Sequence, residues 1–155
     1  MRVSYPDKIK EQARPYLEAG EHALAALMAR PRGATVARAG GLGPAAIGGL
    51  ATARQARAAE AAGLKLASPM GLVLTSRRLL VLRISSPIAM GKGGDVKEFV
   101  SEVPLADVES IEIGRLLAGK VVTVAVRGAS FKLEVGAGSD ARGFCEEFER
   151  AKITA

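Results

Sequence analysis

Residues 71–82 read GLVLTSRRLLVL, and the fold is predicted outward from this stretch. Two apolar runs, 72–75 and 79–84, flank Ser76, Arg77 and Arg78. Apolar runs on either side of a short polar turn predict two antiparallel strands in a hairpin. Both runs are apolar at nearly every position, which is typical of strands covered on both faces. We therefore expect this hairpin at the centre of a sheet.

Further short apolar runs follow and predict strands over residues 97–103, 107–114, 120–126 and 130–135. A glycine-rich segment, 87–95, predicts a loop before the first of them, and Pro104 ends that strand because proline has no N–H for a ladder. In the strand over 107–114, Ile111 and Ile113 share one face, and Ser110 and Glu112 share the other.

The apolar period changes after residue 138, which predicts a C-terminal amphipathic helix. Ser139 is the expected N-cap, and Asp140 suits the positive end of the helix dipole. One apolar stripe runs along this helix and consists of Ala141, Phe144, Cys145, Phe148 and Ala151. We expect this stripe to cover the open side of the sheet.

The first 33 residues are less regular. Residues 7–14 predict a short helix ended by Pro15, and residues 18–21 predict a turn. Residues 22–30 (HALAALMAR) have helical propensity, but the run is short and precedes Pro31, so we favour a first strand.

Residues 34–68 form an alanine- and glycine-rich insertion, in which 39–53 carry no charge. As a helix those 15 residues would span about 22 Å, which is less than the ~30 Å of a bilayer core. Pro44 suits the first position of a helix over 45–62, and Gly63 suits its end. Ala45, Gly49 and Ala53 would then line one face, where a second copy of the chain could approach closely.

Seven strands followed by one helix, with GLVLTSRRLLVL at 71–82 and VPLADVESIEI at 103–113, resemble the bacterial pleckstrin-homology-like family of YokE type. The likeness is good over residues 72–151 and looser over 18–33. It implies a mainly β fold: a barrel of two near-orthogonal antiparallel sheets, closed at one end by the C-terminal helix. We expect one domain, 1–155, with an N-terminal segment 1–20, the insertion 34–68 between strands one and two, and a core over 71–155. A fold shared by many functions identifies no activity by itself.

Charge is concentrated in the first part of the chain. The net charge is +6, and residues 1–70 carry ten basic against five acidic side chains. Five arginines and no acidic residue lie between Glu21 and Glu60, which would suit an anionic membrane surface. The candidate contacts for such a surface are Arg38, Arg54, Arg57, Arg77 and Arg78. Nucleic acid is not an expected partner, because six aromatic side chains are too few to interleave with the basic ones as base-stacking platforms.

Catalytic groups are scarce. One histidine, His22, and one cysteine, Cys145, do not supply a zinc site, and Cys145 on the apolar stripe is expected to be buried. A dyad of these two residues would lack an acid to orient the imidazole. The glycine-rich runs 40–43 and 91–94 lack the context of a nucleotide-binding loop. We therefore expect no enzyme, metal, cofactor or small-molecule substrate.

The expected function is a binding or scaffolding module whose sheet edges and insertion meet a protein partner or another copy of the chain. Peripheral attachment to anionic lipid is the alternative. A single cysteine and an N-terminus without a signal-like apolar run predict a cytoplasmic protein, peripheral to the membrane if the alternative holds.

Overall fold

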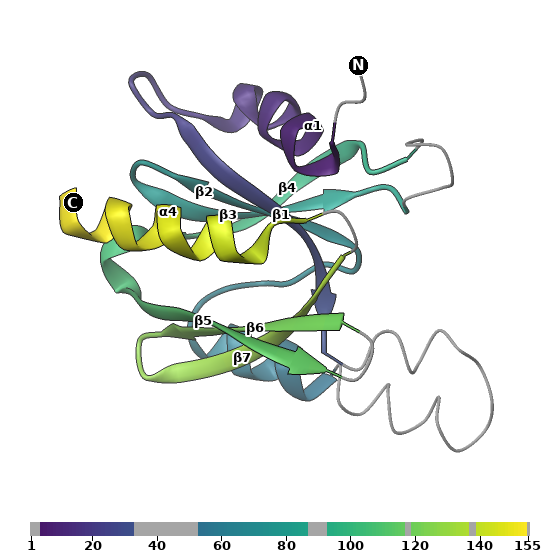
Figure 1. Ribbon diagram of the computed structural model, residues 1–155, viewed down its shortest axis with the longest axis vertical. Helices are drawn as coiled ribbons and strands as arrows, with labels where there is room; N and C mark the ends of the chain where they lie inside the picture. Colours follow the sequence, from purple (N-terminus) through teal and green to yellow (C-terminus); the bar gives the residue numbers. More distant parts are fainter. Residues whose placement is uncertain (1–3, 33–52, 87–92, 117–118, 137–138, 155) are drawn as a thin grey trace.

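The computed structural model describes residues 4–32, 53–86, 93–116, 119–136 and 139–154 (Figure 1). In chain order the elements are α1 (Tyr5–Gln12), η1 (Arg14–Tyr16), β1 (Ala23–Pro31), β2 (Met70–Thr75), β3 (Arg78–Ile84), β4 (Val96–Pro104), η3 (Leu105–Asp107), β5 (Val108–Leu116), β6 (Gly119–Val126), β7 (Ala129–Val135) and α4 (Ala141–Thr154). The seven predicted strands and the C-terminal helix are confirmed, including β1, for which a helix was the alternative.

The strands form one antiparallel series in the order β4-β3-β2-β1-β7-β6-β5. β1 joins the two halves of this series because it pairs with β2 over 23–29 and with β7 over 29–31. The two expected sheets are therefore β4-β3-β2-β1 and β1-β7-β6-β5, which share one strand. The described strands leave β4 and β5 at the two ends of the series.

The main core lies between the two halves and under α4. The rings of Phe144 and Phe148 on α4 are buried against it, together with Phe131 of β7. Figure 1 shows α4 lying across the strands at one side of the barrel. The expectation that an apolar helix stripe closes this side is confirmed.

A second apolar cluster lies on the outer face of β1, β2 and β3, where α1 covers it. Ile9 of α1 is fully buried and lies so close to Gly71 that a Cβ there would be 2.9 Å from its Cγ2 atom. All six residues of β2 are buried. The central hairpin is apolar on both faces because one face meets the core and the other meets α1.

α1 begins two residues earlier than expected. The side chain of Ser4 caps it by accepting a hydrogen bond from the Asp7 N–H at 3.3 Å, and Pro6 lies in its first turn. The helix ends at Gln12, and Pro15 lies in the short helix η1 that follows.

The described end of the insertion is part of the core. Residues 53–61 are helical, and Gly63 follows with a φ of +84°, as expected for a residue that ends a helix. Ala59, Ala62 and Leu64 are buried in the main core. The rest of the predicted helix, including Pro44, Ala45 and Gly49, lies outside the described residues.

The prediction of Ser139 as the N-cap of α4 is wrong by one residue. Asp140 is the cap, since its carboxylate accepts from the Gly143 N–H at 3.0 Å and its carbonyl accepts from the Phe144 N–H. The hydroxyl of Ser139 instead accepts from the Met28 N–H of β1 at 3.0 Å. The Met28 N–H lies just before the part of β1 that pairs with β7, and it donates to Ser139 instead of to another strand. The Ser139 hydroxyl is therefore engaged with β1 and does not cap α4.

Candidate interaction surface

The four described arginines of the predicted anion contact fall into two groups. Arg54 and Arg57 are exposed on the helical stretch 53–61, at the lower end of the molecule in Figure 1. Arg77 and Arg78 lie at the β2–β3 turn, where Arg78 reaches η1. Arg38 lies outside the described residues. The structure therefore does not bring these arginines together into one cluster.

Arg78 is engaged in a buried network. Its guanidinium donates to both carboxylate oxygens of Glu21, at 2.9 and 2.8 Å, and to the carbonyl of Tyr16 at 2.7 Å, and it also pairs with Glu102. The Glu21 side chain is 0% exposed and the Arg78 side chain 13%. The Thr75 hydroxyl donates to Glu21 at 2.6 Å. The guanidinium of Arg78 is thus already paired inside the protein and is poorly placed to bind an external anion.

The same network sets the charge state of Glu21. Hydrogen bonds from Arg78, and then from Thr75, lower the pKa of Glu21 to about 2 in spite of its burial. The pKa of Arg78 is raised, chiefly by its hydrogen bonds to Glu21. Both groups are therefore charged at every physiological pH, and the pair serves to fix β2 and β3 to the start of β1.

Arg77 differs from its neighbour, since it is about half exposed. Its guanidinium lies 3.3 Å from the carboxylate of Glu18, which is itself largely exposed. Exposed pairs of this kind hold each other weakly. Arg77 thus remains accessible, but at a different site from Arg54 and Arg57.

Ala53 is the one member of the predicted small-residue face that the structure describes, and it is half-buried. Ala45 and Gly49 lie outside the described residues. The face formed by Ala45, Gly49 and Ala53 therefore stays a prediction.

The two candidate catalytic side chains are placed unfavourably for catalysis. Cys145 is half-buried at the edge of the main core, where full burial was expected. Burial, and then the nearby carboxylate of Glu149, raise the pKa of its thiol. A nucleophilic cysteine needs the opposite shift. His22 is exposed just before β1.

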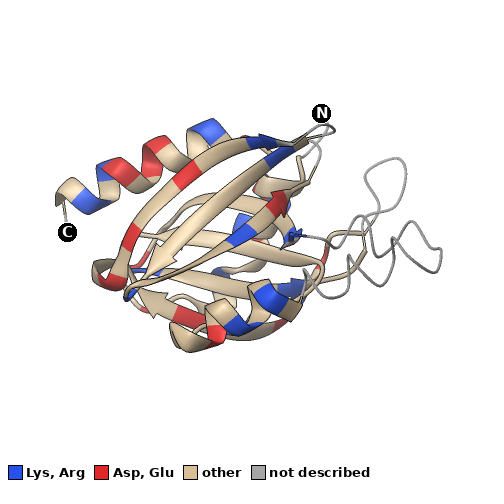
Figure 2. Cartoon of the chain, turned by 90° about the horizontal axis from the view of Figure 1, so that it is seen from below, with Lys and Arg blue, Asp and Glu red and all other residues tan. Residues whose placement is uncertain are grey.

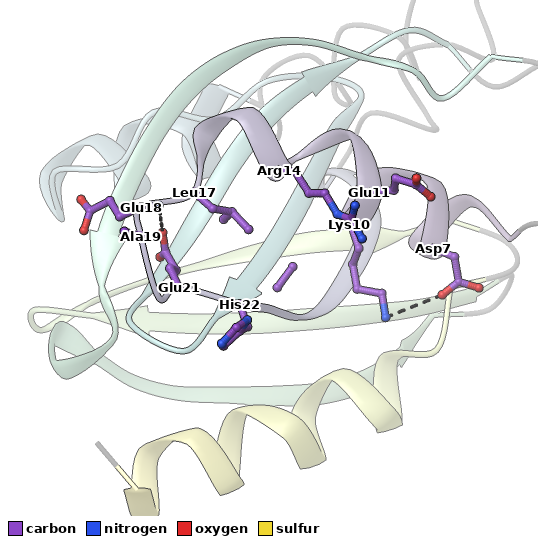
Figure 3. Close-up of a pocket in the computed structure, with 10 residues that line it drawn as sticks. Asp7, Lys10, Glu11, Arg14, Leu17, Glu18, Ala19, Glu21 and His22 are labelled. Atoms are coloured by element: carbon purple, nitrogen blue, oxygen red, sulfur yellow. Dashed lines mark hydrogen bonds and ion pairs between the residues drawn. The ribbon is translucent and has the colours of Figure 1, made fainter.

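A cleft of about 700 Å³ lies between α1 and the start of β1, and Figure 3 shows charged side chains along it. These charges are largely neutralised within the protein, because Lys10 lies 3.7 Å from Asp7, Arg77 pairs with Glu18, and Arg78 pairs with Glu21. Figure 2 likewise shows basic and acidic residues interspersed on α4 and on the strands. The cleft therefore presents no single charge that would select a ligand.

Each of the two sheet edges carries one large exposed apolar side chain. Three large hydrophobic side chains are exposed among the described residues, and two of them, Phe99 (38%) and Ile113 (39%), lie on the edge strands β4 and β5. The third, Ile153, lies near the end of α4. An edge strand has backbone N–H and C=O groups that are free to pair with another chain.

The outer side of β4 is contacted along much of its length. The Val96 N–H donates to the Gln12 side chain of α1 at 2.7 Å, and the Phe99 ring lies 6.0 Å from the Tyr16 ring, centroid to centroid. The backbone of Lys65 makes two hydrogen bonds with the Ser101 hydroxyl, so the chain that follows stretch 53–61 lies beside this strand.

The outer side of β5, which we call the β5 edge, has no such contacts over 111–115. Within the described part of the chain, these residues make no hydrogen bond or ion pair with any element other than β6. Ile111 is buried in the main core (4% exposed), whereas Ile113, two residues on and on the same face, is exposed. The burial of this face of β5 therefore ends between these two residues.

The prediction from the sequence treated the two isoleucines as one apolar face and missed the difference in exposure between them. A usable signal was present, since Phe99 and Ile113 each follow a glutamate and stand in strands rich in charge. Apolar residues flanked by charges are common on edge strands, which use the charges to limit unwanted pairing.

No family model matches the chain, and no curated protein is similar to it. Several solved structures are similar to the chain, and two of them illustrate the likeness. A protein of the DUF1696 family with a pleckstrin-homology domain, from Shewanella loihica, is 13% identical at a TM-score of 0.48, over 93% of this chain and 90% of that one. A pleckstrin homology domain from Shewanella amazonensis is 14% identical, also at a TM-score of 0.48, over 97% and 92%. Neither level of identity assigns a function.

Metal-binding clusters and membrane-spanning helices are both absent from the described residues. Nowhere in them do three or more His, Cys, Asp or Glu side chains gather in a way that could bind a metal ion. No helix among them is long and apolar enough to cross a membrane.

Proposed function

We propose that this chain is a non-catalytic binding module whose partners are proteins, including other copies of itself, and that they dock on its sheet edges. The observation that carries this proposal is the open sheet, which ends in β4 and β5 with a large exposed hydrophobic side chain on each. Free backbone groups beside an apolar side chain are what an added polypeptide strand requires.

The absence of catalysis is part of the same proposal and is supported by the raised thiol pKa of Cys145. Four of the charged side chains that line the cleft beside α1 are engaged in ion pairs, since Asp7 pairs with Lys10 and the carboxylates of Glu18 and Glu21 pair with Arg77 and Arg78. A protein-binding role accounts for the exposed apolar side chains, which a catalytic role would not.

Self-association is the form of the proposal that can be tested without knowing a partner. We expect the mean mass of the chain in sedimentation velocity to rise with protein concentration over about a hundredfold range. A constant monomer mass over that range would contradict the proposal in this form. Ala45, Gly49 and Ala53 remain a second candidate face for such contacts, and an Ala53→Glu variant tests that face.

Anionic lipid is the alternative partner, and one observation favours it: Arg54 and Arg57 are both exposed on one helical stretch. The test is co-sedimentation with vesicles of phosphatidylcholine alone and with added phosphatidylglycerol, at low and high salt. Pelleting that needs the anionic lipid, fades with salt and is lost in the Arg54→Gln/Arg57→Gln variant would support this role. The matched control is Arg83→Gln, which removes an exposed arginine of β3.

A further inference from the structure

We infer that a second copy of the chain docks on the β5 edge, so that two β5 strands pair antiparallel about a two-fold axis at Ile113. This inference rests on the proposed function and adds the surface, the partner and the register. The resulting dimer would join two seven-stranded series into one continuous antiparallel sheet.

The choice of β5 follows from the different surroundings of the two edges. On β4, contacts from Gln12, Tyr16 and Lys65 already occupy the outer side, and the Phe99 ring has the Tyr16 ring beside it. On β5, the described residues supply no such cover over 111–115, and Ile113 is exposed. An added strand would displace existing contacts on β4 but not on β5.

The register follows from the side chains of β5. An antiparallel pair about a two-fold axis normal to the sheet places one residue opposite its own copy and keeps faces matched. An axis at Glu112 would oppose two carboxylates, and an axis at Arg115 would oppose two guanidinium groups, both of which are unfavourable. An axis at Gly114 would set Ile113 against Arg115 of the second copy.

An axis at Ile113 opposes no like charges, although it sets Ile111 against Arg115 of the second copy. It sets the two isoleucine side chains against each other, with Cβ atoms about 4.5–5.5 Å apart, and sets each Glu112 opposite the small Gly114 of the second copy. Two half-exposed apolar side chains are then removed from water together. The pairing spans few residues, so the dimer is expected to be weak and to depend on concentration.

The first test compares single substitutions on the two edges by sedimentation velocity. Ile113→Lys should raise the dimer dissociation constant at least about tenfold, because it places two like charges across the axis. Phe99→Lys is the matched control, with the same substitution at a similarly exposed position on β4, and should leave the constant within about twofold.

Three results separate the two proposals. A wild-type chain that stays monomeric overturns both the inference and the proposed self-association. A wild-type chain that associates, but whose association Ile113→Lys does not weaken, overturns the inference alone. The inference also fails if Phe99→Lys weakens association as much as Ile113→Lys does.

A cross-linking experiment tests the symmetry directly and does not depend on the lysine variant. In a Cys145→Ser background, Ile113→Cys should give a covalent dimer with a short bis-maleimide, because the axis brings residue 113 of both copies together. Phe99→Cys in the same background should give no covalent dimer. Equal cross-linking of the two variants, or none with Ile113→Cys, would overturn the proposed register.

Discussion

Glu21 and Arg78 show how two charged residues, 57 positions apart, fix the hairpin β2–β3 to the start of β1. The pair is nearly inaccessible and is completed by Thr75 and the Tyr16 carbonyl, so its polar atoms are satisfied without water. Removing one partner from such a pair leaves an uncompensated buried charge, which is more costly than the pair itself is stabilising.

The network predicts loss of stability in acid. The folded pKa of Glu21, about 2, lies below the value near 4.3 of an unfolded chain, so its ionised form favours folding. The contribution, roughly 3 kcal/mol, should be complete above about pH 5 and should be lost as the pH falls toward 2. Urea unfolding curves at a series of pH values measure it.

Glu21→Gln should destabilise the protein by about 3–5 kcal/mol at pH 7 and should flatten this part of the pH dependence. Glu98→Gln is the control, since Glu98 pairs with Arg83 in solvent, and it should cost less than about 1 kcal/mol. Equal effects of the two substitutions would contradict the role given to Glu21.

Cys145 is expected to react slowly with thiol reagents. Its raised thiol pKa leaves little thiolate at neutral pH, so labelling with an aromatic disulfide should accelerate as the pH is raised above 8. Glu149→Gln should increase the rate modestly, because the carboxylate contributes to the shift. Labelling at pH 7 as fast as that of the unfolded chain would contradict the assignment of Cys145 as a structural residue.

At the scale of single elements, α4 depends on Asp140 for its start. Asp140→Ala should lower the free energy of unfolding by about 1 kcal/mol, because the Gly143 N–H then loses its acceptor. Asp140→Asn should retain most of the stability, since asparagine caps nearly as well. Chemical denaturation measures both variants, and an Asn variant as unstable as the Ala variant would contradict the capping role.

Elements were more predictable from the sequence than contacts between them. Apolar period and turn residues indicated every strand and α4, because these signals are local. The N-cap of α4 is Asp140 and not the predicted Ser139, because the Ser139 hydroxyl accepts a hydrogen bond from the Met28 N–H, more than 100 residues away in the sequence. The Arg78 network likewise depends on a residue remote in sequence, namely Glu21.

At the scale of the whole molecule, the insertion is not a detachable appendage. Its later part supplies Ala59, Ala62 and Leu64 to the main core, and Arg127 in the β6–β7 turn donates to the Ala62 carbonyl at 2.9 Å. The insertion as defined from composition, 34–68, therefore combines residues outside the described ranges with residues that the barrel requires.

Leu64→Ala tests this integration. The side chain is fully buried, so its truncation should cost about 2–5 kcal/mol in chemical denaturation. Leu66→Ala, at a half-buried position two residues on, should cost clearly less. A loss below about 1 kcal/mol for Leu64→Ala would mean that the barrel does not depend on this segment.

The position of β1 has a consequence for how the chain folds. β1 pairs with β7 across about 100 residues of sequence, and this pairing is what joins the two halves of the sheet. Contacts between segments so distant along the chain form slowly, because a long loop must close first. During synthesis on the ribosome, residues 29–31 of β1 therefore lack their β7 partner until that final strand has emerged.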